Sequence, residues 1–290
     1  MISNNYVVEI ENLTKVYGKL FSRREVKAVD NLSFHIKRGE VCGFLGPNGA
    51  GKTTTIMLLM GFLKPTSGTI HLLGQKPTHV KAKERIGFLP EESYFYKFLN
   101  ADEILNYYGC LFNMSSKQRK RRIDELIDMV GLKDARKRRI REYSKGMQRR
   151  IGIAQALIND PEFIILDEPT SGLDPIGIQE VKALIFKLKE SGKTIFMSSH
   201  LLADVQGVCD RIIMLYQGKL VVEGRTQEIL SKKGHTNIEI LDENGSKKGL
   251  IKEFADLHGI QITSIGEPNI TLEEFFLQNI KTSKNNGVAE

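Results

Sequence analysis

Gly46-Pro-Asn-Gly-Ala-Gly-Lys52-Thr53 is the stretch that decides the fold of this 290-residue chain. It matches the pattern G-x-x-x-x-G-K-[ST] and follows an apolar run, VCGFL at 41–45, that is typical of a buried strand. A helix is expected to begin at Thr53. Because a phosphate-binding loop needs this order of strand, glycine-rich loop and helix, the sequence predicts a triphosphate site here.

Each residue type in this loop has a physical task. The glycines allow the backbone to turn its N–H groups inward around a triphosphate, and Lys52 adds a positive charge at the β- and γ-phosphates. The Thr53 hydroxyl is a ligand for Mg2+, and the helix directs its positive end at the same anion. The expected nucleotide-binding residues are Gly46, Pro47, Asn48, Gly49, Ala50, Gly51, Lys52, Thr53 and Thr54.

A second apolar run, Phe163-Ile-Ile-Leu, ends in the two carboxylates of Asp167 and Glu168. A buried strand should not end in this way unless a cation meets the carboxylates. Asp167 suits the magnesium shell, directly or through water, and Glu168 is placed to orient and deprotonate an attacking water. The pattern alone is as typical of a loop start, but together with residues 46–53 it predicts triphosphate hydrolysis.

The composition is that of a globular protein, with 41% hydrophobic and 27% charged residues. No apolar run approaches the about 18 residues of a membrane-spanning helix. The first residues lack the order of a signal peptide, so we expect the chain to stay in the cytoplasm. The three cysteines are expected to be reduced thiols.

Strands that alternate with helices predict an α/β fold. The expected strands lie at 7–10, 41–45, 69–73, 85–89, 163–167 and 194–198, followed by a hairpin that turns at Gln217 and Gly218. Helical spacing at 123–130, 147–158 and 178–188 adds helices, and a mostly helical insertion is expected at about 92–160.

The composition changes near residue 231, which predicts a small α+β appendix over 235–280. Its expected elements are a strand at 237–241, a helix at 250–257, a strand at 260–265 and a helix at 271–280. Thr271 and Glu274 form a capping box ahead of the last helix. Residues 281–290 are expected to be a disordered tail, and residues 5–230 to form the main domain.

Taken together, the motifs resemble those of the ATP-binding subunits of ABC transporters, over residues 5–225. The signature segment of this family, Leu-Ser-Gly-Gly-Gln, stands here as Tyr143-Ser-Lys-Gly-Met147, so Ser144 and Gly146 are kept. The resemblance implies that this segment caps the γ-phosphate held by the opposite subunit. A helix that merely starts at a serine N-cap is the simpler alternative. The implied fold is a P-loop NTPase core of ABC ATPase type with an N-terminal antiparallel β subdomain.

Three more positions are similar to the family by order and spacing. Asp174, in SGLDP, resembles the D-loop that couples the two sites of the dimer. His200 resembles the switch histidine that contacts the γ-phosphate. Tyr17 resembles the aromatic residue that stacks on adenine, with Phe21 as a rival platform.

The sequence departs from the family at the Q-loop, where Glu91 stands in place of glutamine. The resemblance makes Glu91 a candidate ligand of Mg2+. LPEE, YSKGM and the trailing LEEFFL together resemble the exporter branch, whose permeases are separate polypeptides.

The resemblance implies an ATPase motor. Two copies would bind two ATP-Mg in a head-to-tail homodimer and drive a separately encoded transmembrane permease, as peripheral subunits on the cytoplasmic face of the membrane. Export is the expected direction, and the transported substrate is not readable from the chain.

The alternative function is a soluble ABC-type ATPase that acts on nucleic acid or ribosomes. It is favoured by residues 117–141, whose eleven Lys/Arg and four Asp/Glu account for the net charge of +7. Members that act in translation carry two ATP modules, and repair-type members have a long coiled coil, so we expect no nucleic acid partner. The basic segment is then a solvated face or a contact with acidic lipids or the permease. An unrelated kinase or GTPase would not need Ser144, Gly146 and His200.

Overall fold

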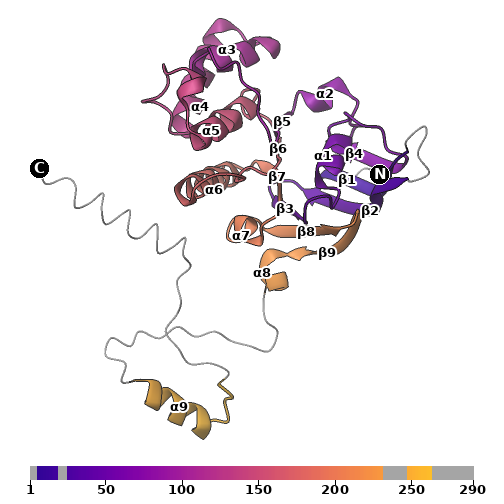
Figure 1. The fold of residues 1–290 in the computed structure, drawn as a ribbon, viewed down its shortest axis with the longest axis vertical. Coiled ribbons are helices and arrows are strands. Elements are labelled where there is room, and N and C mark those ends of the chain that lie inside the picture. Colours follow the sequence, from indigo (N-terminus) through magenta and orange to yellow (C-terminus); the bar gives the residue numbers. More distant parts are fainter. Residues whose placement is uncertain (1–4, 19–24, 231–246, 263–290) are drawn as a thin grey trace, which may run out of the picture. The chain divides into compact units, whose positions relative to one another are not determined.

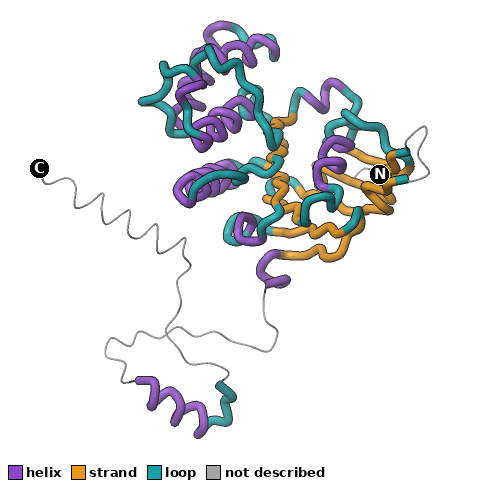
Figure 2. Tube along the Cα trace, viewed as in Figure 1, coloured by secondary structure: helices purple, strands orange, loops and turns teal. Residues whose placement is uncertain are grey.

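The computed structural model describes residues 5–18, 25–230 and 247–262. The chain divides into two compact units, Met1–Leu230 and Ser231–Glu290. Figure 1 shows the elements of the first unit, and Figure 2 distinguishes its helices from its strands.

A six-stranded sheet forms the centre of the first unit. Its order is β5-β6-β7-β3-β8-β9, in which the first five strands are parallel and β9 is antiparallel to β8. Every residue of β3, β6 and β7 is buried, as expected for parallel strands with both faces covered. The strands are β3 (Val41–Leu45), β5 (Ile86–Leu89), β6 (Phe163–Leu166), β7 (Thr194–Ser199), β8 (Arg211–Tyr216) and β9 (Lys219–Arg225).

A second, antiparallel sheet has the order β2-β1-β4, with β1 (Tyr6–Tyr17), β2 (Val26–Lys37) and β4 (Ser67–Leu72). It confirms the N-terminal β subdomain, but β2 is a strand that the sequence analysis did not identify. Asp30 and Asn31 are turn-forming residues in the middle of β2, and Asn31 has φ 52°. The irregular register between β1 and β2 accommodates them, so the strand continues past a turn signal.

The helices of the first unit follow the predicted alternation. The insertion contains three of them, α3, α4 and α5, which Figure 1 shows grouped together. Glycines with positive φ follow α4 at Gly131 (φ 65°) and α6 at Gly192 (φ 80°), as their spacing predicted. The helices are α1 (Lys52–Leu59), α2 (Val80–Lys83), α3 (Ala101–Leu111), α4 (Ser116–Met129), α5 (Lys145–Ala156), α6 (Pro175–Glu190), α7 (Leu202–Val205) and α8 (Thr226–Leu230), with a 3-10 turn at Ile140–Glu142.

The six-stranded sheet separates two hydrophobic cores. The three-stranded sheet and α1 cover one face, whereas α5 and α6 cover the other. Because side chains alternate along a strand, β6 supplies both cores, with Phe163 and Ile165 on the first face and Ile164 and Leu166 on the second. The sheet is therefore fixed from both sides, which gives a rigid support to the loops at its edge.

The predicted hairpin is confirmed. β8 and β9 are joined by Gln217 (φ 48°) and Gly218 (φ 78°), and two successive left-handed residues are the signature of the tight turn that suits twisted strands. The cysteines Cys42, Cys110 and Cys209 are free thiols.

Within the second unit, α9 (Lys247–Leu257) confirms the predicted helix. Residues 260–262 are not in a strand, contrary to that part of the predicted strand. The other predicted elements of the appendix, the capping box of Thr271 and Glu274, and the tail lie outside the described residues. No helix in the described part of the chain is long and apolar enough to cross a membrane.

The core between the six-stranded sheet and the three-stranded sheet leads to a prediction about stability. Phe196 is fully buried, with its ring centroid 4.9 Å from that of Phe44 and 6.1 Å from that of Phe34. We expect Phe196→Ala to lower the free energy of unfolding by about 3–5 kcal/mol, because it removes apolar contacts and leaves a cavity. The matched control is Phe186→Ala, at a 47% exposed position, which should change it by less than about 0.5 kcal/mol. Urea titration of the three proteins measures both, and equal losses would contradict the assignment of the core.

Candidate functional site

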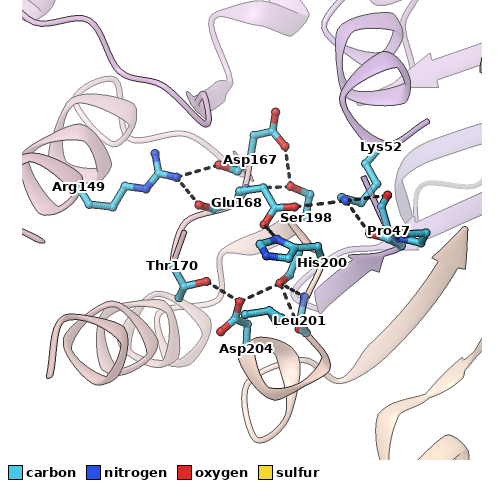
Figure 3. A network of polar contacts seen from close by, with 12 residues as sticks. Pro47, Lys52, Arg149, Asp167, Glu168, Thr170, Ser198, His200, Leu201 and Asp204 are labelled. Atoms are coloured by element: carbon cyan, nitrogen blue, oxygen red, sulfur yellow. Dashed lines mark hydrogen bonds and ion pairs between the residues drawn. The ribbon is translucent and has the colours of Figure 1, made fainter. Parts of the chain in front are cut away.

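Four neighbouring parallel strands, in the order β5, β6, β7 and β3, end at the same edge of the sheet. Open α/β sheets bind their ligands at this edge. Glu91 follows β5, Asp167 and Glu168 follow β6, His200 follows β7, and the loop that starts at Gly46 follows β3. The topology thus gathers four predicted segments that are far apart in the sequence, and Figure 3 shows polar contacts among the segments that follow β3, β6 and β7.

The phosphate-binding loop directs a cation into the site. The Lys52 ammonium is buried, donates to the Gly46 carbonyl oxygen at 2.7 Å and lies 3.3 Å from Glu168 Oε1. α1 begins at Lys52, one residue earlier than predicted, and its N-cap is Gly51 with φ 104°. A side chain at Gly51 would also collide with the Ala28 carbonyl oxygen, so conformation and space both require glycine. Thr53 is exposed on the first turn of α1.

Glu168 is only 5% exposed, and its carboxylate is held from two sides (Figure 3). Lys52 approaches Oε1, and His200 Nδ1 lies 2.8 Å from Oε2. The backbone of Glu168 has φ 49°, in the left-handed region that non-glycine residues rarely adopt. Its N–H donates to Ser198 Oγ at 2.8 Å. Strained backbone at a buried, reactive side chain is typical of functional sites.

Asp167, one residue earlier, is 3% exposed and accepts a hydrogen bond from Ser198 Oγ at 2.6 Å. Burial raises the pKa of the Asp167 carboxyl, and the negative charges of Glu91 and Glu168 raise this pKa further, against the lowering effects of Ser198 and Lys52. A carboxylate in such a negative surrounding is stabilised by an added cation. The direction of the shift therefore fits a cation-binding role.

His200 lies against Glu168 rather than alone on the surface. Because an ionised carboxylate only accepts hydrogen bonds, the contact assigns a proton to Nδ1 of the ring. The ring is about one-third exposed, with 36% of its side-chain surface accessible. His200 is thus placed to orient Glu168 and still face solvent.

The sequence analysis missed a buried carboxylate behind this pair. Asp204 is 4% exposed, and its Oδ2 accepts from Thr170 Oγ1 at 2.8 Å and from Ser199 Oγ at 2.9 Å (Figure 3). It therefore joins the loop after β6 to the end of β7, next to His200. The two serines that end an otherwise apolar run, Ser198 and Ser199, were the available signal.

A buried arginine was missed as well. Arg149, on α5, is 7% exposed and donates to backbone carbonyl oxygens of the loops that follow β5 and β6. It stands beside Gln148 and Arg150 in a polar run, and nothing in the sequence sets it apart from them.

The predicted signature segment and D-loop meet in a second place. Both line a cavity of about 280 Å³, and no residue of the phosphate-binding loop belongs to its lining. Ser144 is the N-cap of α5, where its Oγ accepts from the Met147 N–H at 3.2 Å. Asp174 caps α6 in the same way, through the Gly177 N–H at 2.8 Å. We call this the signature cavity; its lining includes Ser144, Lys145, Gly146, Gly172, Leu173 and Asp174.

Glu91 and Tyr17 both have exposed side chains. The Glu91 side chain is exposed, and its negative charge raises the pKa of both Asp167 and Arg149. Tyr17, at the end of β1, is 41% exposed, and the Lys15 ammonium lies 5.3 Å from the centroid of its ring. Its stacking role stays a prediction, and Phe21 lies outside the described residues.

Comparison with known proteins identifies the family of this chain. Residues 29–171 match the ABC transporter family. The chain is 46% identical to an ABC transporter ATP-binding protein of Synechocystis sp., over 87% of this chain and 71% of the relative. It is 39% identical to the bacitracin transport ATP-binding protein BcrA of Bacillus licheniformis, over 90% of this chain and 83% of the relative.

A solved structure is similar in three dimensions. It is the dimeric structure of a post-hydrolysis state of an ATP-binding cassette bound to ADP and Pi, with a TM-score of 0.68 and 28% identity, over 75% of this chain and 98% of that chain. The fold, the arrangement of the site and these relatives lead to one conclusion: the chain belongs to the ATP-binding proteins of ABC transporters, which are ATPases.

Proposed function

We propose that this protein is the motor subunit of an exporter, in which Glu168 activates the water that hydrolyses ATP. The observation that carries the proposal is the buried Glu168 carboxylate, fixed between Lys52 and His200 at the edge where four parallel strands end. A general base must be held within reach of its target, and a carboxylate pinned at both oxygens meets that requirement. His200 keeps the carboxylate oriented.

Mg2+ fits the residues at this edge. Among the described residues, no three His, Cys, Asp or Glu side chains are grouped as a metal cage. A magnesium ion that is held largely by phosphates and water needs only one or two protein carboxylates. Asp167, Thr53 and Glu91 would hold the ion, which supplies neutralising charge for the phosphate oxygens when bound.

The position of the signature cavity supports a head-to-tail homodimer. In the described part of the chain, Ser144 and Gly146 line a cavity without the phosphate-binding loop, so they are available to a nucleotide held by another copy. The N-terminus of α5 and the Ser144 hydroxyl suit an anion. The related cassette whose title describes a dimer supports this arrangement.

Export through a separately encoded permease is supported by the relative that is named for bacitracin transport. We place the subunit at the cytoplasmic face of the membrane, as a peripheral partner of that permease. In the basic segment 117–141, most cations pair within the chain, for example Arg136 with Asp102 and Asp124. This internal pairing weakens the case for a nucleic acid partner.

The first prediction from the site concerns Lys52. Lys52→Ala should weaken ATP binding by about 2–5 kcal/mol, because the phosphates lose a buried cation. Calorimetric titration measures the affinity, and Lys187→Ala, an exposed lysine of α6, is the matched control with unchanged affinity. An unchanged affinity in Lys52→Ala would contradict the assignment of the phosphate-binding loop.

The second prediction concerns Glu168. Glu168→Gln should still bind ATP-Mg but hydrolyse it at least about 100-fold more slowly, because the general base is lost. It should also form a dimer with ATP that is visible by size-exclusion chromatography. Glu190→Gln, at the exposed end of α6, is the control. A Glu168→Gln protein that binds ATP and stays monomeric argues against the sandwich dimer.

The third prediction concerns Glu91. Glu91→Gln should keep the ATPase rate within about tenfold, because an amide oxygen still binds the ion, but it should weaken the dependence of ATP affinity on Mg2+. Removing this negative charge lowers the repulsion that the γ-phosphate meets when no ion is present. Nucleotide titrations with and without chelator measure the effect, with Glu92→Gln as the control from the same loop. If the magnesium dependence of the Glu91→Gln protein equals that of the wild type, Glu91 does not lie near the metal.

A further inference from the structure

The guanidinium of Arg149 donates to five backbone carbonyl oxygens, and Figure 3 shows its contacts with Asp167 and Glu168. Nε donates to Pro169 O at 3.0 Å, Nη1 to Pro90 O and Glu91 O at 2.8 Å each, and Nη2 to Asp167 O at 3.1 Å and to Glu168 O. A guanidinium has five N–H donors, so these five acceptors match its full capacity. Burial lowers the pKa of Arg149, and the charges of Asp167, Glu91 and Glu168 counteract this.

Three of the acceptors belong to consecutive residues, 167 to 169, at the point where β6 ends. The angles φ and ψ of Glu168 set the relative orientation of the two peptide groups on either side of this residue. Nη2 binds the carbonyl oxygens of both, so one nitrogen restricts both angles. In an extended strand, successive carbonyl groups point in opposite directions. They can share this nitrogen because Glu168 has left the strand conformation, with φ 49°.

The other two acceptors lie in the loop that carries Glu91. The planar fork of arginine can bridge two groups of carbonyl oxygens at once, which the single ammonium of lysine cannot do. Arg149 therefore connects the loop after β5 with the loop after β6 through one rigid group.

We propose that Arg149 is a positioning residue for ATP hydrolysis, which holds the backbone of Glu168 in the left-handed conformation and couples it to the loop of Glu91. Arg149 acts through Glu168, and the inference rests on the proposed role of Glu168 as general base. If Arg149 is removed, the Glu168 carboxylate should move from its position and the hydrolysis rate should fall. Nucleotide binding should be unchanged, because the hydrogen bonds of Arg149 do not involve Lys52 or the phosphate-binding loop.

The test compares Arg149→Gln and Arg149→Lys with a matched control, Arg122→Gln. Arg122 is also a largely buried arginine, with 18% side-chain exposure, and donates to the Leu157 carbonyl oxygen at 2.7 Å, away from the catalytic edge. We expect Arg149→Gln to lower kcat at least about tenfold while the ATP affinity changes less than about threefold, with Arg149→Lys in between. Arg122→Gln should keep kcat within about twofold.

A double substitution separates positioning from general loss of structure. If Arg149 acts through Glu168, Arg149→Gln should cause little further loss of the single-turnover rate in a Glu168→Gln background. The proposal is overturned if Arg149→Gln lowers the single-turnover rate as much in the Glu168→Gln background as in the wild type. It is also overturned if Arg149→Gln alone lowers kcat and ATP affinity in parallel, or leaves kcat unchanged. Should Arg149→Gln fail to fold, Arg149→Lys decides by the same criteria.

Hydrogen exchange adds a direct readout of the coupling. In Arg149→Gln, peptides that cover 88–95 and 164–172 should both lose protection, and in Arg122→Gln neither should. Loss in one peptide only overturns the coupling between the loops. A Glu168→Gln protein that retains full turnover is a separate result, because it removes the proposed role of Glu168 whatever Arg149 does.

Discussion

Glu168 leaves its strand in the left-handed conformation, and the geometry of the catalytic edge depends on that single turn of the backbone. A residue with a side chain pays conformational energy to adopt φ near 50°, so the surrounding structure must hold it there. Here the N–H of Glu168 is bound by Ser198, its carbonyl oxygen by Arg149, and its carboxylate by Lys52 and His200. Each polar group of Glu168 therefore has a partner that helps to fix its position.

Charge balance is the second requirement of this edge. Two buried cations, Lys52 and Arg149, lie among the buried carboxylates of Asp167 and Glu168. An isolated buried charge is strongly unfavourable, and removing one member of such a group leaves the others uncompensated. Here Lys52 lies 3.3 Å from Glu168, and Arg149 donates to backbone carbonyl oxygens, so both cations have partners within the protein.

The sequence predicted the parts of the site whose chemistry is local. The phosphate-binding loop is a continuous motif, and Asp167 and Glu168 stand out as carboxylates that end an apolar strand. Arg149 could not be predicted, because its partners lie in other loops and come near only through the sheet order. Asp204 has one local partner, Ser199, but its other partner, Thr170, lies in another loop. In the same way, β2 could not be predicted, because its turn-forming residues are accommodated by irregular pairing with β1.

The contact between Lys52 and Glu168 has a consequence for the timing of the reaction. One ammonium carries three N–H donors, and it already serves the Gly46 carbonyl oxygen and Glu168. A terminal phosphate that enters the loop competes with the carboxylate for the same positive charge. As the phosphate takes a larger share of Lys52, the Glu168 carboxylate loses part of this ion pair, and His200 is left as its side-chain partner. If Glu168 is the general base, as we propose, its carboxylate would be released from Lys52 only when a phosphate is present to be hydrolysed.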